Sequence, residues 1–404
     1  MRGSRGIGLA SVLAVLALLL LVTALLSDND GDRLPLLLEL VLSTDIGSPD
    51  TDGDGLLDGA EIALGCSPLS EDTDSDGLQD GYEVRLGISP VRSWRLRLDA
   101  EAVKAALSLH YRRKIRALAS MLSSQDLVET VWSVLAWVNE NLSYDYAKEA
   151  LEEALLDDPP TVLLRSRRGI CGDYALATAA LLLEAGVQEV YVIVLEFEHT
   201  ELKHAAAMVR ISGDYFVLDQ HLPPMQLGGY VKYLERIGGD KVSGLRALRA
   251  SLLDTSEVAV EEISLGEAET GMFRPNPSAL REAVSNVLEG RGLAEDRRLR
   301  NCAREWLKCV FAGAEICRIN VPRAYERGLA YTIAIPVYYL DTPFLEKFVE
   351  HKMESIPSRG ETLLYKAFYV EVELHEEHVF ITEKGRAVTM PTYIVSICLA
   401  GRAH

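Results

Sequence analysis

Hydrophobic and polar residues follow three different patterns along the chain. An uncharged run covers residues 7–26, and residues 189–195 form a short, β-branched apolar run that predicts a buried strand. Over residues 125–141, apolar side chains recur at intervals of three and four, which predicts an amphipathic helix; they are Val128, Val131, Trp132, Leu135, Val138 and Leu142. Helical and strand periodicities therefore coexist, and we expect an α+β protein.

The N-terminal run is long enough to meet a membrane. At about 1.5 Å per residue, a helix of its length spans roughly 30 Å, the thickness of a hydrocarbon core. Arg2 and Arg5 precede the run and aspartates follow it, which places the body of the protein outside the cytoplasm. We expect residues 1–27 to be a transmembrane signal anchor or a cleaved signal peptide, which leaves the body either membrane-attached or secreted. Residues 28–49 form a spacer.

Two acidic segments, 50–71 and 72–93, repeat with a period of 22 residues. Carboxylates stand at positions 1, 3, 5, 9 and 12 of each copy: Asp50, Asp52, Asp54, Asp58 and Glu61, then Asp72, Asp74, Asp76, Asp80 and Glu83. Glycine holds position 6 and leucine (Leu56, Leu78) holds position 7. A Ca²⁺ loop needs oxygen ligands at this spacing, including the backbone carbonyl at position 7 and a bidentate Glu at position 12.

The alternative for this region is a solvated acidic linker, but a linker needs neither the regular spacing nor the glycines. A related segment, residues 28–39, has Arg33 at position 6 and Leu36 at position 9, so we do not count it as a site. The two full copies resemble thrombospondin type 3 repeats. That resemblance implies two structural Ca²⁺ ions and a stiffened stalk, with no role for the ions in catalysis.

The charge balance limits the possible partners. The chain of 404 residues has a net charge of −19, and between Asp28 and Glu83 there are 16 acidic residues and one basic residue. Most of the negative charge is thus local to the repeats. An acidic protein repels phosphate backbones, so we exclude nucleic acid as a partner.

A candidate nucleophile opens a predicted helix. Gly169 to Tyr174 (GICGDY) precedes an alanine- and leucine-rich segment that ends at Gly186. Cys171 would therefore feel the positive end of the helix dipole, which favours its thiolate. One cysteine with scattered histidines lacks the paired spacing of a zinc site, so we do not expect zinc.

A predicted hairpin supplies a base and an orienting acid. Strands at 205–211 and 215–218 flank Ser212-Gly213, and a two-residue turn there would put His204 and Asp219 within side-chain reach. A cysteine nucleophile needs a base, and the base needs a third group, which Cys171, His204 and Asp219 could supply. His199 and His221 remain alternative bases.

At these residues the chain resembles the transglutaminase-like superfamily. The resemblance is carried by Gly169-x-Cys171-x-Asp173-x-Ala175, by the later His204 and Asp219, and by residues 131–146 upstream. It implies a papain-like core, with a helix-borne cysteine packed on an antiparallel sheet that carries the His and Asp. It also implies acyl transfer through a thioester, without a catalytic cofactor. We assign residues 94–260 to this domain and residues 261–404 to a C-terminal α+β domain of unknown role.

The remaining cysteines could form disulfides outside the cell. Cys302 and Cys309 stand about 10.5 Å apart along a predicted helix and cannot bond to each other. Their partners would be Cys317 and Cys398 in either order, or all four are free thiols. Cys66 would be unpaired. Few Asn and Gln with abundant Arg, Leu and Glu indicate a heat-adapted source.

The sequence therefore predicts an extracytoplasmic thiol peptidase or amidase that acts on protein or peptide substrates. The alternatives are a protein-crosslinking transglutaminase and a non-catalytic calcium-binding surface module for adhesion or assembly. The sequence does not predict the oligomeric state.

Overall fold

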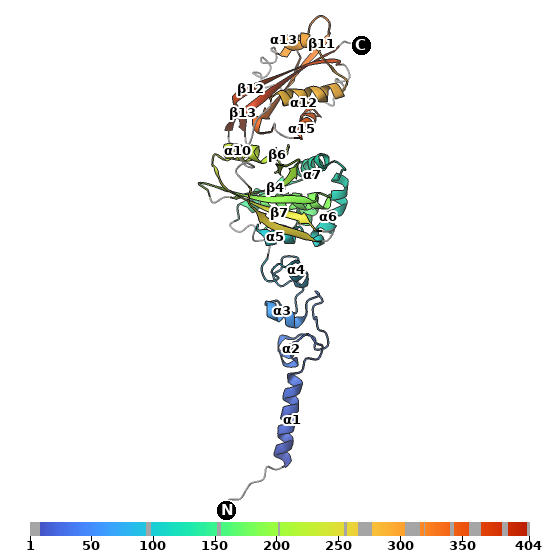
Figure 1. The fold of residues 1–404 in the computed structure, drawn as a ribbon, viewed down its shortest axis with the longest axis vertical. Coiled ribbons are helices and arrows are strands. Elements are labelled where there is room, and N and C mark those ends of the chain that lie inside the picture. Colours follow the sequence, from blue (N-terminus) through green and yellow to red (C-terminus); the bar gives the residue numbers. More distant parts are fainter. Residues whose placement is uncertain are drawn as a thin grey trace, which may run out of the picture. The chain divides into compact units, whose positions relative to one another are not determined.

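The structure is a computed structural model that describes residues 9–93, 98–151, 155–200, 203–253, 257–265, 277–303, 316–318, 320–339, 343–354, 365–381 and 387–401. Arg2, Arg5 and Cys309 lie outside these residues. The chain divides into two compact units, residues 1–105 and residues 106–404. Figure 1 labels the helices and strands of both.

The first unit begins with the uncharged run, which forms helix α1 (Leu9–Leu25) of 17 residues. Within the described part of the chain, no helix is both long and apolar enough to cross a membrane. The expected membrane anchor or signal peptide at residues 1–27 stays a prediction of the sequence.

Three consecutive loops, each followed by a short helix, make up the rest of this unit. The helices are α2 (Leu36–Leu42), α3 (Asp58–Leu64) and α4 (Asp80–Leu86), and α5 (Ala100–Ala106) follows them at the boundary of the unit. Each of the three helices ends in a residue of left-handed conformation, namely Ser43, Gly65 and Gly87. The predicted spacer at 28–49 thus contains the same kind of loop and helix as the two acidic repeats.

Neighbouring loop-and-helix repeats are joined by a hydrogen bond from a glycine N–H to an aspartate side chain. Oδ2 of Asp32 accepts a hydrogen bond from the Gly59 N–H at 3.1 Å, and Oδ2 of Asp54 accepts one from the Gly81 N–H at 2.6 Å. A Cβ atom on Gly59 would lie only 2.3 Å from the Asp32 carbonyl oxygen. Glycine is therefore required at this position, because any side chain would separate the two repeats.

The second unit contains a six-stranded antiparallel sheet with the strand order β6-β5-β4-β3-β7-β8. Its central strand β3 is buried on both faces, which explains the continuous apolar run in its sequence. The strands are β3 (Glu189–Phe197), β4 (Lys203–Ile211), β5 (Asp214–Leu218), β6 (Met225–Gln226), β7 (Val242–Leu252) and β8 (Val258–Ile263).

Helices cover this sheet on both faces. Helix α10 packs on the face that carries Tyr191, Ile193 and Leu195, and α9 packs against β3 and β4 from the other side. Helices α6 and α7 lie against α9. The helices of this region are α6 (Leu109–Leu122), α7 (Leu127–Asn141), α8 (Tyr146–Glu149), the π-helical turn Thr161–Ser166, α9 (Cys171–Glu184) and α10 (Leu227–Gly238). The predicted amphipathic helix at 125–141 is thereby confirmed as α7.

The C-terminal part of the second unit has its own sheet, with the order β10-β11-β13-β12-β9, and its own hydrophobic core. Its strands are β9 (Ala294–Glu295), β10 (Ile316–Arg318), β11 (Arg327–Pro336), β12 (Ala367–Ile381) and β13 (Ala387–Gly401). Its helices are α12 (Pro277–Gly290), α13 (Arg300–Ala303), α15 (Leu345–Glu354) and the 3₁₀ turns Arg297–Leu299 and Val337–Tyr339. The expected mixture of helix and sheet is confirmed.

Cys66, Cys171, Cys302 and Cys398 are free thiols. Of the two alternatives left open by the sequence, free thiols hold for Cys302 and Cys398. Both sulfurs are buried in the C-terminal domain, where the Cys302 thiol donates a hydrogen bond to the Asn320 carbonyl at 3.1 Å. Free cysteine behaves here as a small apolar core residue.

Candidate active site

Cys171 is the first residue of α9 and is partly exposed to solvent. Two short parallel strands, β1 (Ser143–Tyr144) and β2 (Arg168–Gly169), pair immediately before it and fix the entry of the chain into the helix. At Gly172 a Cβ atom would lie 2.6 Å from a Leu156 methyl group. The glycine after the cysteine therefore lets Leu156 close over the start of the helix.

His204 and Asp219 come together at the open end of the hairpin formed by β4 and β5. Ser212 and Gly213 both have positive φ and form the predicted two-residue turn, so the expected hairpin register is confirmed. Asp219 follows the end of β5, and its Oδ2 lies 3.1 Å from Nε2 of His204. With Nε2 engaged by the carboxylate, Nδ1 is the ring nitrogen left for the thiol.

The electrostatics tie the three predicted residues together. Burial alone would lower the pKa of His204, but the charge of Asp219 and side-chain hydrogen bonds with Asp219 and Cys171 outweigh it and raise the pKa to about 10. Burial alone would raise the pKa of Asp219, but the imidazolium charge and hydrogen bonds from His204 and Tyr230 hold it below its ordinary value. The arrangement thus favours an imidazolium–carboxylate pair beside the sulfur.

Two residues that the sequence analysis did not identify hold Asp219 in place. The Tyr230 hydroxyl on α10 donates to Oδ2 of Asp219 at 2.9 Å, and the ring is fully buried. Nδ2 of Asn139 on α7 donates to the carbonyl of Gln220 at 2.9 Å. Neither residue belongs to a recognisable motif, and each contact joins two different elements of the fold.

Tyr144 is a further neighbour of Cys171. Tyr144 pairs with Gly169 across β1 and β2, and Cys171 follows Gly169 by two residues along the chain. Burial raises the pKa of Tyr144, as does the charge of Cys171, while a hydrogen bond with the Cys171 backbone lowers it. The Tyr144 hydroxyl therefore lies at the start of α9, and it donates to Oε1 of Glu149 at 3.2 Å.

Asp173, the acid of the cysteine motif, has a structural role. Its buried carboxylate accepts hydrogen bonds from the N–H groups of Asp157 and Ile170 and forms an ion pair with Lys148, with Nζ and Oδ2 2.7 Å apart. Burial raises its pKa, and Lys148 acts in the opposite direction. The lysine also offsets the repulsion that Asp173 would otherwise exert on a Cys171 thiolate.

The alternative bases occupy other positions. Nδ1 of His199 lies 2.9 Å from Oδ1 of Asp240, and its side chain is 76% exposed. His221 is close enough to Asp219 for its charge to lower the pKa of that carboxyl. Of the three histidines, His204 is the one whose surroundings include both the sulfur and a buried carboxylate.

In the first unit, the predicted metal ligands gather in two groups. One carboxylate oxygen from each of Asp50, Asp52 and Asp54 lies within 4.8 Å of the others, and the same holds for Asp72, Asp74 and Asp76. Both Oε atoms of Glu61 and of Glu83 are buried and have no hydrogen-bond partner. Burial and the charges of neighbouring aspartates raise the pKa of Glu61 to about 8 and that of Glu83 to about 10.

The two aspartates at position 9, Asp58 and Asp80, form hydrogen bonds within their own loops. Oδ1 and Oδ2 of Asp58 accept hydrogen bonds from the N–H and the hydroxyl of Thr51, and Asp80 binds Thr73 in the same way. These carboxylates close the loops from within. Leu56 and Leu78 occupy position 7, where each N–H donates to the aspartate at position 5.

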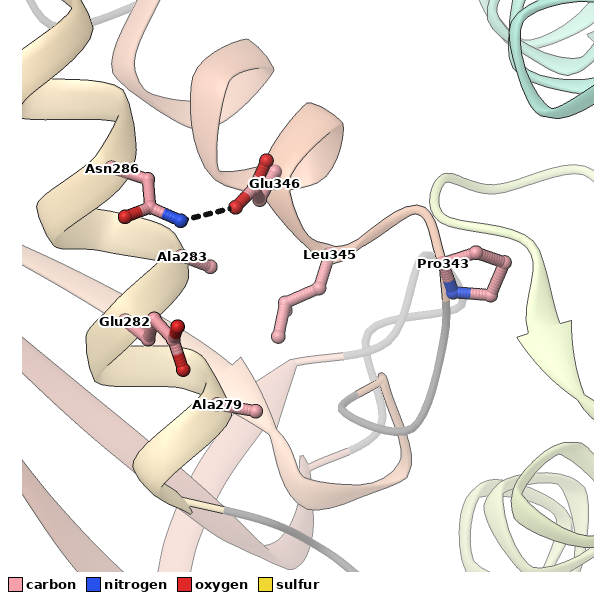
Figure 2. Close-up of a pocket in the computed structure, with 7 residues that line it drawn as sticks. All are labelled: Ala279, Glu282, Ala283, Asn286, Pro343, Leu345 and Glu346. Carbon is pink, nitrogen blue, oxygen red and sulfur yellow. Dashed lines mark hydrogen bonds between the residues drawn. The ribbon is translucent and has the colours of Figure 1, made fainter. Parts of the chain in front are cut away.

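A surface pocket lies in the C-terminal part of the second unit. Figure 2 shows it between α12 and α15, where Nδ2 of Asn286 donates to Oε1 of Glu346 at 2.6 Å. None of the residues that line it is a predicted site residue.

Comparisons with known proteins identify the type of domain in this part of the chain. Residues 113–242 match a family model described as a transglutaminase-like domain. A UPF0252 protein of Archaeoglobus fulgidus is 28% identical over 283 residues, which cover 65% of this chain and 80% of that protein. UPF0252 proteins of Pyrococcus horikoshii and Pyrococcus furiosus are 23% and 24% identical, cover 66% and 67% of this chain, and are themselves covered over 82% and 80%.

The relatives come from thermophilic archaea, in keeping with the composition. Among solved structures, Legionella pneumophila LapG aligns with 15% identity and a TM-score of 0.23, over 32% of this chain and 77% of that one. Residues 113–242 include Cys171, His204 and Asp219, so the predicted site lies wholly inside the matched region. The chain therefore carries a transglutaminase-like domain within an α+β fold.

Proposed function

We propose that this domain is a thiol enzyme that cleaves amide bonds of proteins or peptides, with Cys171 as nucleophile, His204 as general base and acid, and Asp219 as the orienting carboxylate. The observation that carries the proposal is the pairing of His204 with Asp219 at 3.1 Å beside a partly exposed cysteine at a helix start.

The chemistry follows from this arrangement. The Cys171 thiolate adds to the amide carbonyl carbon, and His204 gives its proton to the departing nitrogen, so that the C–N bond breaks as the C–S bond of a thioester forms. Water then adds to the thioester with His204 as base and releases the acid and the thiol. The backbone N–H at the start of α9 is available to the oxyanion, and the Tyr144 hydroxyl becomes a second donor when its proton turns from Glu149 to the substrate.

The test compares wild type with Cys171→Ala and His204→Gln on a mixture of peptides, with mass spectrometry of the products. Cleavage by wild type alone supports hydrolysis. Incorporation of a fluorescent primary amine into a glutamine-bearing protein would instead indicate crosslinking. Absence of both activities, together with equal alkylation of all accessible thiols, would leave a non-catalytic module.

The first unit has a separate proposed role, which is to bind Ca²⁺ in the loops at 50–61 and 72–83. The supporting observation is that Glu61 and Glu83 are buried with unpartnered oxygens, an arrangement that is costly without a cation. Three aspartates, the position-7 carbonyl and the glutamate of each loop supply hard oxygen ligands of the kind Ca²⁺ takes.

Removal of Ca²⁺ with a chelator is expected to open residues 50–90 to proteolysis, while Mg²⁺ at the same concentration protects less well. An unchanged digestion pattern would count against these two sites. The placement of the protein outside the cytoplasm stays a prediction of the sequence.

A further inference from the structure

Glu39, in the first of the three loop-and-helix repeats, is fully buried, and neither of its carboxylate oxygens has a hydrogen-bond partner. The charges that act on it most strongly are those of Asp30, Asp32 and Asp28 in its own loop, followed by Asp58 of the next repeat. A buried, unpaired carboxylate aimed at other carboxylates is unfavourable unless a cation joins them.

The same pattern of unpartnered oxygens occurs in all three repeats. Oδ2 at position 3 and both Oε atoms at position 12 lack a partner, and these atoms belong to Asp30 and Glu39, to Asp52 and Glu61, and to Asp74 and Glu83. Carboxylate oxygens of Asp28, Asp30 and Asp32 also lie within 4.8 Å of one another, as in the two later loops. The first loop therefore offers the same ligand atoms as the other two.

We propose that the loop from Asp28 to Glu39 is a third Ca²⁺ site, formed by Asp28, Asp30, Asp32, the Leu34 carbonyl and Glu39. The inference rests on the Ca²⁺ role proposed for the two following repeats, and it extends that role to a segment whose sequence departs from theirs.

The two departures do not remove a ligand. Arg33 at position 6 has a φ of 74°, close to the 91° of Gly55 and the 94° of Gly77, so the loop turns in the same way despite its side chain. Position 9 holds Leu36, but the corresponding Asp58 and Asp80 bind the threonine at position 2. In the first repeat position 2 is Asn29, so the acid and its threonine partner are absent together.

The loop at 28–39 is joined to the loop at 50–61 in the same way as that loop is joined to the loop at 72–83. Asp32 and Asp54, both at position 5, each use Oδ1 for the N–H of position 7 and Oδ2 for a glycine N–H of the next repeat. An ion held by Asp32 would therefore lie next to the contact that orders the second loop.

The experiment counts the Ca²⁺ bound to the full chain. Metal is stripped with a chelator, Ca²⁺ is added back, and the stoichiometry is measured by native mass spectrometry and by elemental analysis. We expect three ions in wild type, two in Glu39→Gln, two in Glu61→Gln and two in Glu83→Gln. Asp45→Asn is the matched control, since it removes an exposed acid of the same repeat outside the loop, and it should keep three.

Two ions in wild type with no loss in Glu39→Gln would overturn the third site while the two proposed sites stand. No bound ion at all would overturn every site. Thermal unfolding gives a second readout, because Glu39→Gln removes a buried charge. With chelator present its melting temperature should equal or exceed that of wild type, whereas in Ca²⁺ it should be lower. A decrease under both conditions would indicate a purely structural residue and overturn the proposal.

Discussion

Tyr230 donates its hydroxyl proton to the same oxygen of Asp219 that faces His204, across 2.9 Å. The carboxylate is thereby fixed from the sheet side and from α10 at once. Because a hydrogen bond to a charged group contributes about 1.5–3 kcal/mol, its loss should be felt in the imidazolium pair. Tyr230→Phe is expected to lower kcat about tenfold and to shift the basic limb of the pH–rate profile to higher pH, because a carboxylate without this donor holds the His204 proton more strongly. An unchanged profile would restrict Tyr230 to packing.

Cys171 should be the thiol that alkylates first. Burial raises the pKa of both Cys66 and Cys398 to about 12, whereas Cys171 is partly exposed at a helix start. With iodoacetamide near neutral pH, peptide mapping should show Cys171 modified at least tenfold faster than either. His204→Gln should slow the reaction, and equal rates at the three sulfurs would contradict an activated nucleophile.

The His204–Asp219 pair should make stability depend on pH. Because the pKa of His204 is raised in the folded state, its contribution is complete below the ordinary value near 6.5 and is lost as the pH rises through about 10. The melting temperature of wild type minus that of His204→Gln should therefore fall between pH 7 and pH 10. A constant difference would show that the histidine is not held as an imidazolium.

The Tyr144 hydroxyl is expected to stabilise the oxyanion by donating a hydrogen bond to it. Removing one preorganised donor commonly costs about 10²-fold to 10³-fold in kcat, so Tyr144→Phe should lower kcat by this order and change KM little. Tyr146→Phe is a matched control, because Tyr146 is 46% exposed and its ring lies tilted against that of Tyr144. Equal effects of the two changes would exclude a specific role for the Tyr144 hydroxyl.

The Asp173–Lys148 pair should stabilise the fold and not the reaction directly. Breaking a buried pair from one side typically costs about 3–5 kcal/mol, since a charge is left uncompensated. Asp173→Asn and Lys148→Met should each destabilise by about 3 kcal/mol in denaturant unfolding, and the double variant should lose clearly less than their sum. Strict additivity would mean that the two side chains do not interact.

Local rules explain why much of the site could be predicted. The turn at Ser212-Gly213 sets the hairpin register, and that register alone puts His204 and Asp219 within reach. Cys171 is placed by the helix boundary. In contrast, Tyr230 and Asn139 act across separate elements, and no spacing in the sequence encodes such contacts.

In the repeats, by contrast, residue types alone did not predict the conformation of the first loop. The sequence pattern did not indicate a Ca²⁺ site from Asp28 to Glu39, because Arg33 stands at position 6 and Leu36 at position 9. Its backbone nevertheless follows the other loops, since an arginine can adopt the positive φ that glycine adopts more readily. The choice between disulfides and free thiols stayed open in the sequence for a related reason, because cysteine spacing does not show whether two sulfurs come within bonding distance.

The contact between Asp32 and the glycine of the next helix has an evolutionary consequence. In each case the aspartate and the glycine that it binds in the next repeat are 27 residues apart. An insertion or deletion of a few residues within a repeat would therefore break its hydrogen bonds to the repeats before and after it. Growth or shortening of this segment is tolerated only by duplication or loss of whole 22-residue blocks. Among natural variants of the protein, the length of this region should therefore change in steps.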